Sequence, residues 1–214
     1  MKRNRFDNLV DGFFAIVLTL LVIKIRVPEI SGPVTDLALW TALKDMVPLF
    51  ASYVLAFGVL ASYWTGHHFI MSMCAMNLTR KLAYINIPFL LFVALVPFTS
   101  QFLGTYSTSP LAVELFGINT IIIGIFQFFI LFYVKRSPEI TNSFEHIREI
   151  RFAYIRVWLP VLSACIAIFL SQFNTHYSIY IFILAVVFNL IPGSVHWVHG
   201  TLFPNRTTPT RVQT

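Results

Sequence analysis

Charged side chains are scarce in this 214-residue chain, where they make up 11% of all residues, less than half of the roughly 25% that is usual in soluble domains. Hydrophobic residues account for 57%. Stretches without any Lys, Arg, Asp or Glu run over residues 82–113, 115–134 and 157–205, and each can hold at least one membrane span of about 20 residues. The scarcity of charge excludes an ordinary soluble domain and predicts an all-α membrane protein.

Cysteine and catalytic motifs are also scarce. Cys74 and Cys165 are the only cysteines and both lie in apolar surroundings, so we expect small packing residues rather than a disulfide framework or a metal site. The sequence has no Gly-rich phosphate loop, no GxSxG elbow and no Ser-His-Asp pattern. We therefore expect no enzyme and no cofactor. A TVGYG potassium filter is absent too, so conduction would need another selectivity device.

The basic residues lie at the ends of the apolar stretches, which points to membrane topology rather than to nucleic acid. We expect a helical turn after an N-cap at Asp36. The six expected spans are residues 8–27, 47–69, 84–104, 111–134, 157–170 and 177–198. Residues 1–200 would form one six-helix domain and residues 201–214 a polar cytoplasmic tail.

With six spans, both termini lie on one side of the membrane, and twelve of the fifteen basic residues lie on that side too. The other three are Lys24, Arg26 and Lys44. Because Lys and Arg are enriched in cytoplasmic loops, this split predicts cytoplasmic N- and C-termini.

The first apolar segment contains an acid. Gly12 to Ile23 is too short to span a membrane, and residues 8–27 reach the required length only by including Asp11 and Lys24. An ionisable residue in a span is a functional hypothesis by default. The alternative is an ordinary apolar helix whose acid is favoured at the N-terminus by the helix dipole.

Helical spacing places Ile16, Leu20 and Ile23 on one stripe of this segment, with Thr19 beside it. Branched apolar side chains would then line one face over about 10 Å. Asp11 lies about 140° around the helix from Ile16. The acid and the stripe are thus expected to face different directions.

Polar residues recur in the second and third spans. His67 and His68 follow Tyr63-Trp64, and Asn86 lies in an apolar helix. Adjacent histidines point about 100° apart and no HExxH motif accompanies them, so we do not expect a metal site. Hydrogen bonds within the bundle, from a histidine to Asp11 or Asn86, are the favoured interpretation. Asn86 also suits a purely structural interhelical bond.

Three motifs resemble the six-helix potassium channels of bacteria and archaea that are related to the animal endolysosomal potassium channel. The first helix of that family typically reads R-x-x-x-F-S-D-G-x-F-A-I-x-x-T-L-L. The matching residues here are Arg5, Asp11, Gly12, Phe14, Ala15, Ile16, Thr19, Leu20 and Leu21. Tyr63-Trp64 with His67-His68 is similar to the family's Y-W-x-x-H-H, and the third motif is Asn86 with residues 91–99. Leu9-Val10 replace the family's Phe-Ser, which removes a serine hydroxyl beside the acid.

The resemblance implies a homotetramer in which the first helix of each subunit lines a central pore. It implies a weakly potassium-selective cation channel of a prokaryotic plasma membrane, with potassium ions and lipid as partners and no nucleic acid. By position, Ile16, Leu20 and Ile23 would form a hydrophobic constriction, with Thr19 and Lys24 next to the pore. The polar network that holds the first helix would consist of Arg5, Asp11, Trp64, His67, His68 and Asn86.

Two other functions remain open at this point. A non-conducting bundle would keep the family fold but lose conduction through Leu9-Val10 and Lys24, whose charge would oppose cations. A proton pathway would use Asp11 and the histidines, and its flux should depend steeply on pH between about 5 and 8.

Overall fold

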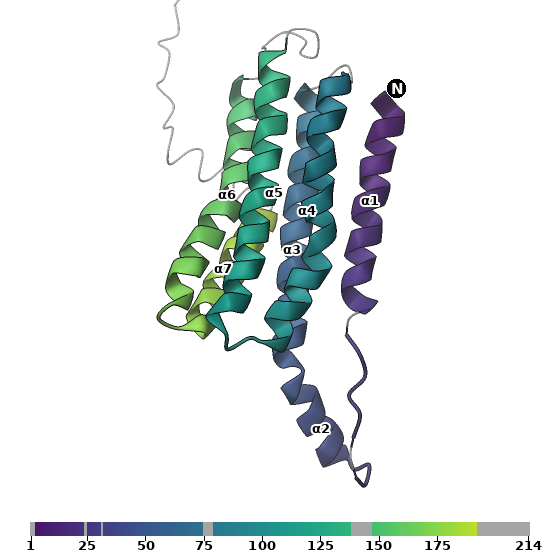
Figure 1. Ribbon diagram of the computed structural model, residues 1–214, viewed down its shortest axis with the longest axis vertical. Helices are drawn as coiled ribbons and strands as arrows, with labels where there is room; N and C mark the ends of the chain where they lie inside the picture. The colour runs from purple at the N-terminus through teal and green to yellow at the C-terminus, as the bar shows by residue number, and fades with distance from the viewer. Residues whose placement is uncertain (1–2, 24, 31, 75–78, 138–146, 192–214) are drawn as a thin grey trace, which may run out of the picture.

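All regular secondary structure is helical in the part of the chain that its computed structural model describes, which comprises residues 3–23, 25–30, 32–74, 79–137 and 147–191 (Figure 1). The helices are α1 (Arg3–Ile23), α2 (Asp36–Asp45), α3 (Val47–Phe69), the short π-helix η1 (Ile70–Cys74), α4 (Arg80–Thr105), α5 (Pro110–Arg136), α6 (Ile147–Ser171) and α7 (Thr175–Leu190). The described residues include no strand. The expected all-α class is confirmed.

Helices α3 to α7 form one bundle, and α1 lies at its edge (Figure 1). Among its neighbours, α1 packs on α3 and α4. Helix α2 projects beyond one end of the bundle and buries none of its residues. One side of α1 is consequently left uncovered within a single chain.

Local sequence explains where several helices begin. Thr35 caps α2 because its hydroxyl accepts a hydrogen bond from the Ala38 N–H, and Thr79 caps α4 in the same way through Leu82. The expectation of Asp36 as the cap of α2 was wrong by one residue. Thr35 has the extended backbone of a cap, whereas Asp36 is already helical and adds a favourable negative charge to the first turn.

Within the described ranges, four helices are long and apolar enough to cross a membrane: Arg5–Ile23, Val47–Ser72, Arg80–Thr105 and Pro110–Arg136. The last two expected spans correspond to shorter apolar helices, Val157–Ser171 and Tyr177–Asn189. Helix α6 begins at residue 147, inside the stretch expected to be a polar connection. The end of the sixth expected span and the 201–214 tail lie outside the described residues. The number of spans stays a prediction.

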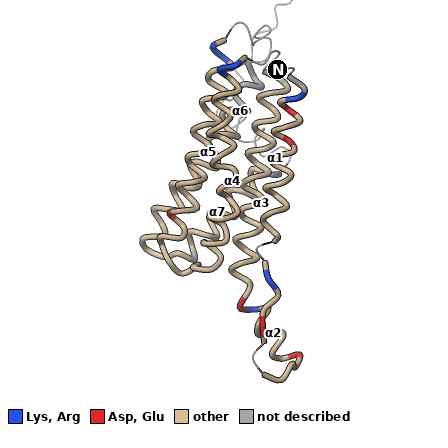
Figure 2. The backbone as a smooth tube through the Cα atoms, turned by 45° about the vertical axis from the view of Figure 1, so that its right-hand side comes forward, with Lys and Arg blue, Asp and Glu red and all other residues tan. Residues whose placement is uncertain are grey.

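Charged residues gather at the two ends of the molecule (Figure 2). One end carries the start of α4, Arg80-Lys81, and the end of α5, Lys135-Arg136. The other end carries α2 and the loop before it, with Arg26 and Lys44. This separation matches the distribution on which the topology prediction rests, while the side that faces the cytoplasm stays a prediction.

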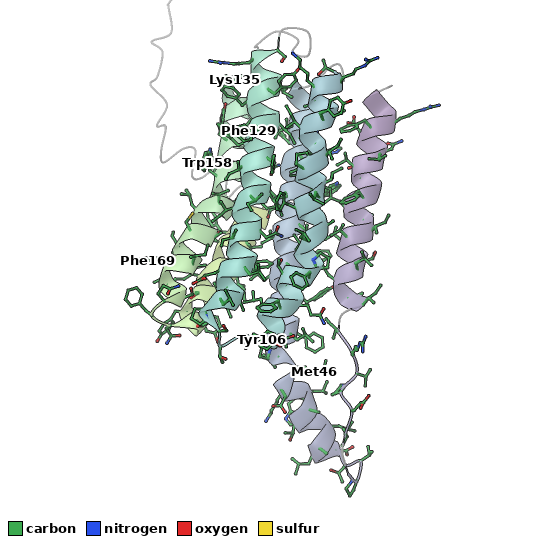
Figure 3. All side chains as sticks on the ribbon, viewed as in Figure 1. Met46, Tyr106, Phe129, Lys135, Trp158 and Phe169 are labelled. Atoms are coloured by element: carbon green, nitrogen blue, oxygen red, sulfur yellow. The ribbon has the colours of Figure 1, made fainter. Side chains whose placement is uncertain are left out.

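The outer surface of the bundle is apolar. Phe129, Trp158 and Phe169 lie on the outer side of α5 and α6 (Figure 3), and each is exposed. Cys165 of α6 is exposed as well. Its expected role as a packing residue was therefore wrong, because an apolar stretch of a membrane helix need not face its own bundle. The side chain of Cys74 lies outside the described residues.

Helices α3, α5 and α6 approach one another closely at Gly124. A Cβ atom at this position would overlap the Val161 side chain and lie 3.0 Å from the Tyr63 hydroxyl. That hydroxyl donates to the Thr120 carbonyl over 2.6 Å. The absence of a side chain at Gly124 thus allows the buried tyrosine to cross between helices.

Gly124→Ala is expected to lower the free energy of unfolding by about 1–3 kcal/mol, because the added methyl must push α6 away from α5. Thermal unfolding in detergent measures the effect. Gly12→Ala is the matched control, since a Cβ there meets nothing within 4 Å and alanine gains about 1 kcal/mol in helix propensity. Equal stability of Gly124→Ala and the unmodified chain would contradict the close packing.

Candidate channel site on the first helix

One face of α1 is buried against its own bundle. Phe14 of this face packs near Phe89 of α4, with ring centroids 6.0 Å apart. The buried residues recur at helical spacing and are Phe6, Val10, Phe14, Val17 and Leu21. This face fixes the rotation of α1 about its axis relative to α3 and α4.

A second face of α1 is apolar and uncovered. Ile16, Leu20 and Ile23 lie on it with 61%, 41% and 65% of their surface exposed. Thr19 is exposed beside them. Its hydroxyl donates to the Ile16 carbonyl over 2.8 Å, so this hydroxyl is not an unpaired donor on the apolar face. The three branched side chains of this stripe have no partner helix among the described residues of a single chain.

Asp11 lies on a different side of α1 from the stripe, where it faces α3. Its Oδ1 accepts a hydrogen bond from the Trp64 Nε1–H over 2.9 Å. The indole ring lies 6.0 Å from the ring of His68. The acid is half-buried, and this hydrogen bond ties α1 to α3 within the apolar part of the bundle.

His67 and Asn86 form the buried polar pair of the site. His67 Nε2 lies 2.7 Å from Asn86 Oδ1, and Asn86 Nδ2 donates to the Leu82 carbonyl over 2.8 Å. Because the amide nitrogen is engaged there, its oxygen faces the imidazole, which donates from Nε2. The His67 ring also stacks on Phe89 at 5.2 Å. The choice between the two histidines, which the sequence left open, is settled: His67 is buried and His68 is exposed.

A small cavity of about 30 Å³ is lined by one member of each pair, Asp11 and His67. Asp7, Asp11, His67 and His68 are among its lining residues. Its volume is close to that of one water molecule. The sequence reasoning missed Asp7, although its position one turn before Asp11 places both acids on the same side of the helix.

The structure therefore assembles most of the expected polar network as two hydrogen-bonded pairs rather than as one continuous chain. Arg5 is exposed near the start of α1, and no hydrogen bond within the described part of the chain joins it to the other five residues. Lys24 lies outside the described residues. No group of three or more His, Cys, Asp or Glu side chains that could hold a metal ion occurs in the described ranges.

Trp64→Phe removes the donor to Asp11 and is expected to destabilise the fold by about 1–2 kcal/mol. Combined with Asp11→Leu it should cost little more than either change alone, because both remove the same bond. Thermal unfolding of the four proteins in detergent gives this comparison. Trp40→Phe on the exposed α2 is the control. Additive losses from Trp64 and Asp11 would show that the bond contributes nothing.

Comparison with known proteins shows which channels the chain resembles. Residues 5–97 match the model of the family described as endosomal/lysosomal potassium channel TMEM175. The chain is 38% identical over 105 residues to a potassium channel of Streptomyces collinus, a stretch that covers 49% of each protein. It is 25% identical over 192 residues to a potassium channel of a Chryseobacterium species, covering 90% of this chain and 94% of the relative.

More distant relatives include the mouse protein named endosomal/lysosomal proton channel TMEM175, which is 25% identical over 62% of this chain and 26% of its own length. The aligned stretch thus spans about half of the Streptomyces protein and about a quarter of the mouse protein.

The fold also matches the crystal structure of a lysosomal potassium-selective channel TMEM175 homologue from Chamaesiphon minutus. The TM-score is 0.73 at 22% identity, over 87% of this chain and 95% of that one. The family match covers α1, α3 and most of α4, which together carry the stripe and both polar pairs. Residues 5–97 are thus similar to the TMEM175 family, and the fold of the chain is similar to that of a solved TMEM175 homologue.

Proposed function

We propose that four copies of this chain surround a pore and conduct cations, with potassium weakly preferred over sodium. The observation that carries this proposal is the exposed stripe of Ile16, Leu20 and Ile23 on a helix that buries a different face. A single chain cannot enclose a pore with one helix, whereas four copies arranged about an axis can bring four stripes together. The potassium-channel names of the bacterial relatives support the proposal.

The stripe would act as a hydrophobic constriction. A ring of apolar side chains gates by excluding water when it is narrow and by admitting water when it widens. Potassium gives up its hydration water at a lower cost than sodium, so such a ring favours potassium without binding it. Thr19 and Lys24 would lie next to this pore.

The two polar pairs would set the direction of the stripe. The Trp64–Asp11 bond holds α1 to α3, and the Phe14–Phe89 contact beside His67 holds it to α4. With these contacts on one side, the exposed stripe is directed away from the chain's own bundle. In a tetramer that direction would be the pore axis.

The remaining parts of the proposal follow from topology. The channel would lie in the plasma membrane of a prokaryote, with both termini in the cytoplasm. Residues 1–200 would form the channel domain and residues 201–214 a cytoplasmic tail. Its partners would be potassium ions and lipid, with no cofactor, no nucleic acid and no enzymatic activity.

Ion flux into liposomes that carry the purified protein tests the proposal. Separate potassium and sodium gradients and a proton reporter distinguish the permeant ions, and the mass of the protein in detergent gives the number of copies. Faster potassium than sodium flux from a tetramer is the expected result. A monomer, or a tetramer without flux, would contradict it; the second outcome describes a non-conducting bundle and directs attention to Leu9, Val10 and Lys24.

A proton pathway is the second candidate function. The observation in its favour is the small cavity between Asp11 and the two histidines, which has room for about one water molecule. The name of the mouse relative points to the same ion. Proton flux that rises or falls steeply between about pH 5 and 8, without potassium flux, would support this candidate over the first.

A further inference from the structure

A larger cavity opens at the end of the bundle that carries α2, near the positions that Met46 and Tyr106 mark in Figure 3. It measures about 350 Å³ and lies between the first turns of α3, the end of α4 and the first half of α7. That volume falls in the range of small-molecule pockets. None of its lining residues comes from α1, so it is separate from the stripe and from both polar pairs.

The wall of this cavity is mainly apolar. Ala51, Leu103, Ile179 and Ile183 contribute to it from three helices. The hydroxyl of Ser52, which also lines it, already donates to the Leu49 carbonyl over 2.9 Å. Because hydrocarbon gains free energy when it leaves water for such a surface, the wall suits an alkyl chain better than a polar solute.

Among the described residues, Lys44 is the only charged one that lines the cavity, and it is the next-to-last residue of α2. Its ammonium group lies 5.6 Å from the centre of the exposed Trp40 ring. Among the described residues Lys44 has no carboxylate partner, and the neighbouring Asp45 does not line the cavity. A lysine ammonium binds phosphate as a compact point charge.

We propose that this cavity holds one acyl chain of an anionic phospholipid, whose phosphate pairs with Lys44. The depth of the site agrees with this occupant, because the apolar span of α3 begins at Val47, three residues after Lys44. The charge lies where lipid headgroups lie, and the apolar wall continues from there into the hydrocarbon region. The proposal requires only that the chain is embedded in a membrane, so it does not depend on conduction.

Photo-crosslinking in vesicles tests the proposal. The protein is reconstituted into phosphatidylcholine vesicles that contain a small fraction of phosphatidylglycerol with a diazirine in its acyl chain. A parallel sample carries the same diazirine on phosphatidylcholine, and peptide mapping by mass spectrometry locates the label. The expected result is enrichment of the phosphatidylglycerol label in residues 47–52 and 179–183 over the phosphatidylcholine label.

Lys44→Gln should reduce that enrichment about fivefold, as expected for one basic residue near an anionic membrane surface. Lys81→Gln, an exposed lysine at the opposite end, is the matched control and should leave it unchanged. Ala51→Phe should lower the cavity label from both lipids by filling the space, and Ile183→Phe provides the same test from α7 if the first variant does not fold.

Three results would overturn the proposal. Label spread evenly over the exposed faces of α4, α5 and α6 would show that the cavity is not occupied by lipid. Equal labelling by the two lipids in the unmodified protein, or unchanged enrichment in Lys44→Gln, would show that Lys44 recognises no phosphate. Labelling is read without any flux measurement, so a failed channel assay leaves this result interpretable.

Discussion

Leu20→Asn is expected to increase cation flux through the reconstituted protein and to reduce its preference for potassium over sodium. In the proposed tetramer the change places four amide groups where four apolar side chains exclude water, so the constriction stays wet for more of the time. A barrier lowered by about 1.4 kcal/mol corresponds to a tenfold rise in flux. Ile23→Asn, the most exposed position of the stripe, should act in the same direction.

Ile118→Asn is the matched control for these variants. Ile118 is half-exposed on α5, away from the stripe, so the same amide there should leave flux and selectivity unchanged. Liposome flux of potassium and sodium for the three variants, measured at equal amounts of tetramer, completes the comparison. If Leu20→Asn and Ile23→Asn both kept the flux and selectivity of the unmodified protein, the stripe would not line the pore.

Asn86→Leu is expected to destabilise the fold by about 1–3 kcal/mol. The change removes the oxygen that accepts from His67 Nε2 and leaves a buried imidazole donor unpaired. Adding His67→Phe should restore most of the loss, because replacing both partners with apolar groups of similar shape removes the unmet donor. A phenyl ring at position 67 also keeps the stacking on Phe89.

Thermal unfolding of the two single variants and the double variant in detergent measures this pattern. A double variant as unstable as the sum of the single ones would show that the pair contributes by something other than its mutual hydrogen bond. Flux measurements on the stabilised double variant are equally informative. Retained conduction there would assign His67 and Asn86 a structural role and would count against a proton pathway through them.

The sequence predicted the parts of the molecule that follow from regular geometry. Because the period of a helix is constant, spacing alone predicted that Asp11 faces a different direction from Ile16. Apolar length located α3, α4 and α5 to within a few residues. The start of α6 was missed because polarity ends an apolar stretch without ending a helix, and residues 147–156 contain Arg, Glu and Ala, which favour helix.

For contacts that depend on how helices pack, the sequence suggested a few candidate partners but did not identify the actual one. The sequence does not distinguish His67 from His68. The rotation of α3 against α4 buries His67 and exposes His68. The side chain that donates a hydrogen bond to Asp11 is that of Trp64, four residues before His68 in the sequence. The cavity that Lys44 lines could not be predicted from the sequence, because its walls come from positions more than 130 residues apart.

The separation of charge to the two ends limits how the helices can move in a bilayer. Arg5 precedes the apolar part of α1 and Arg26 follows it. Sliding α1 along its axis by one turn, about 5.4 Å, would draw one of these cations toward hydrocarbon, where a charge costs up to about 3 kcal/mol at mid-depth. Arg80-Lys81 and Lys135-Arg136 anchor α4 and α5 at the same level. In the proposed tetramer, opening of the pore by rotation or tilt of α1 would avoid this cost, whereas a piston movement across the membrane would incur it.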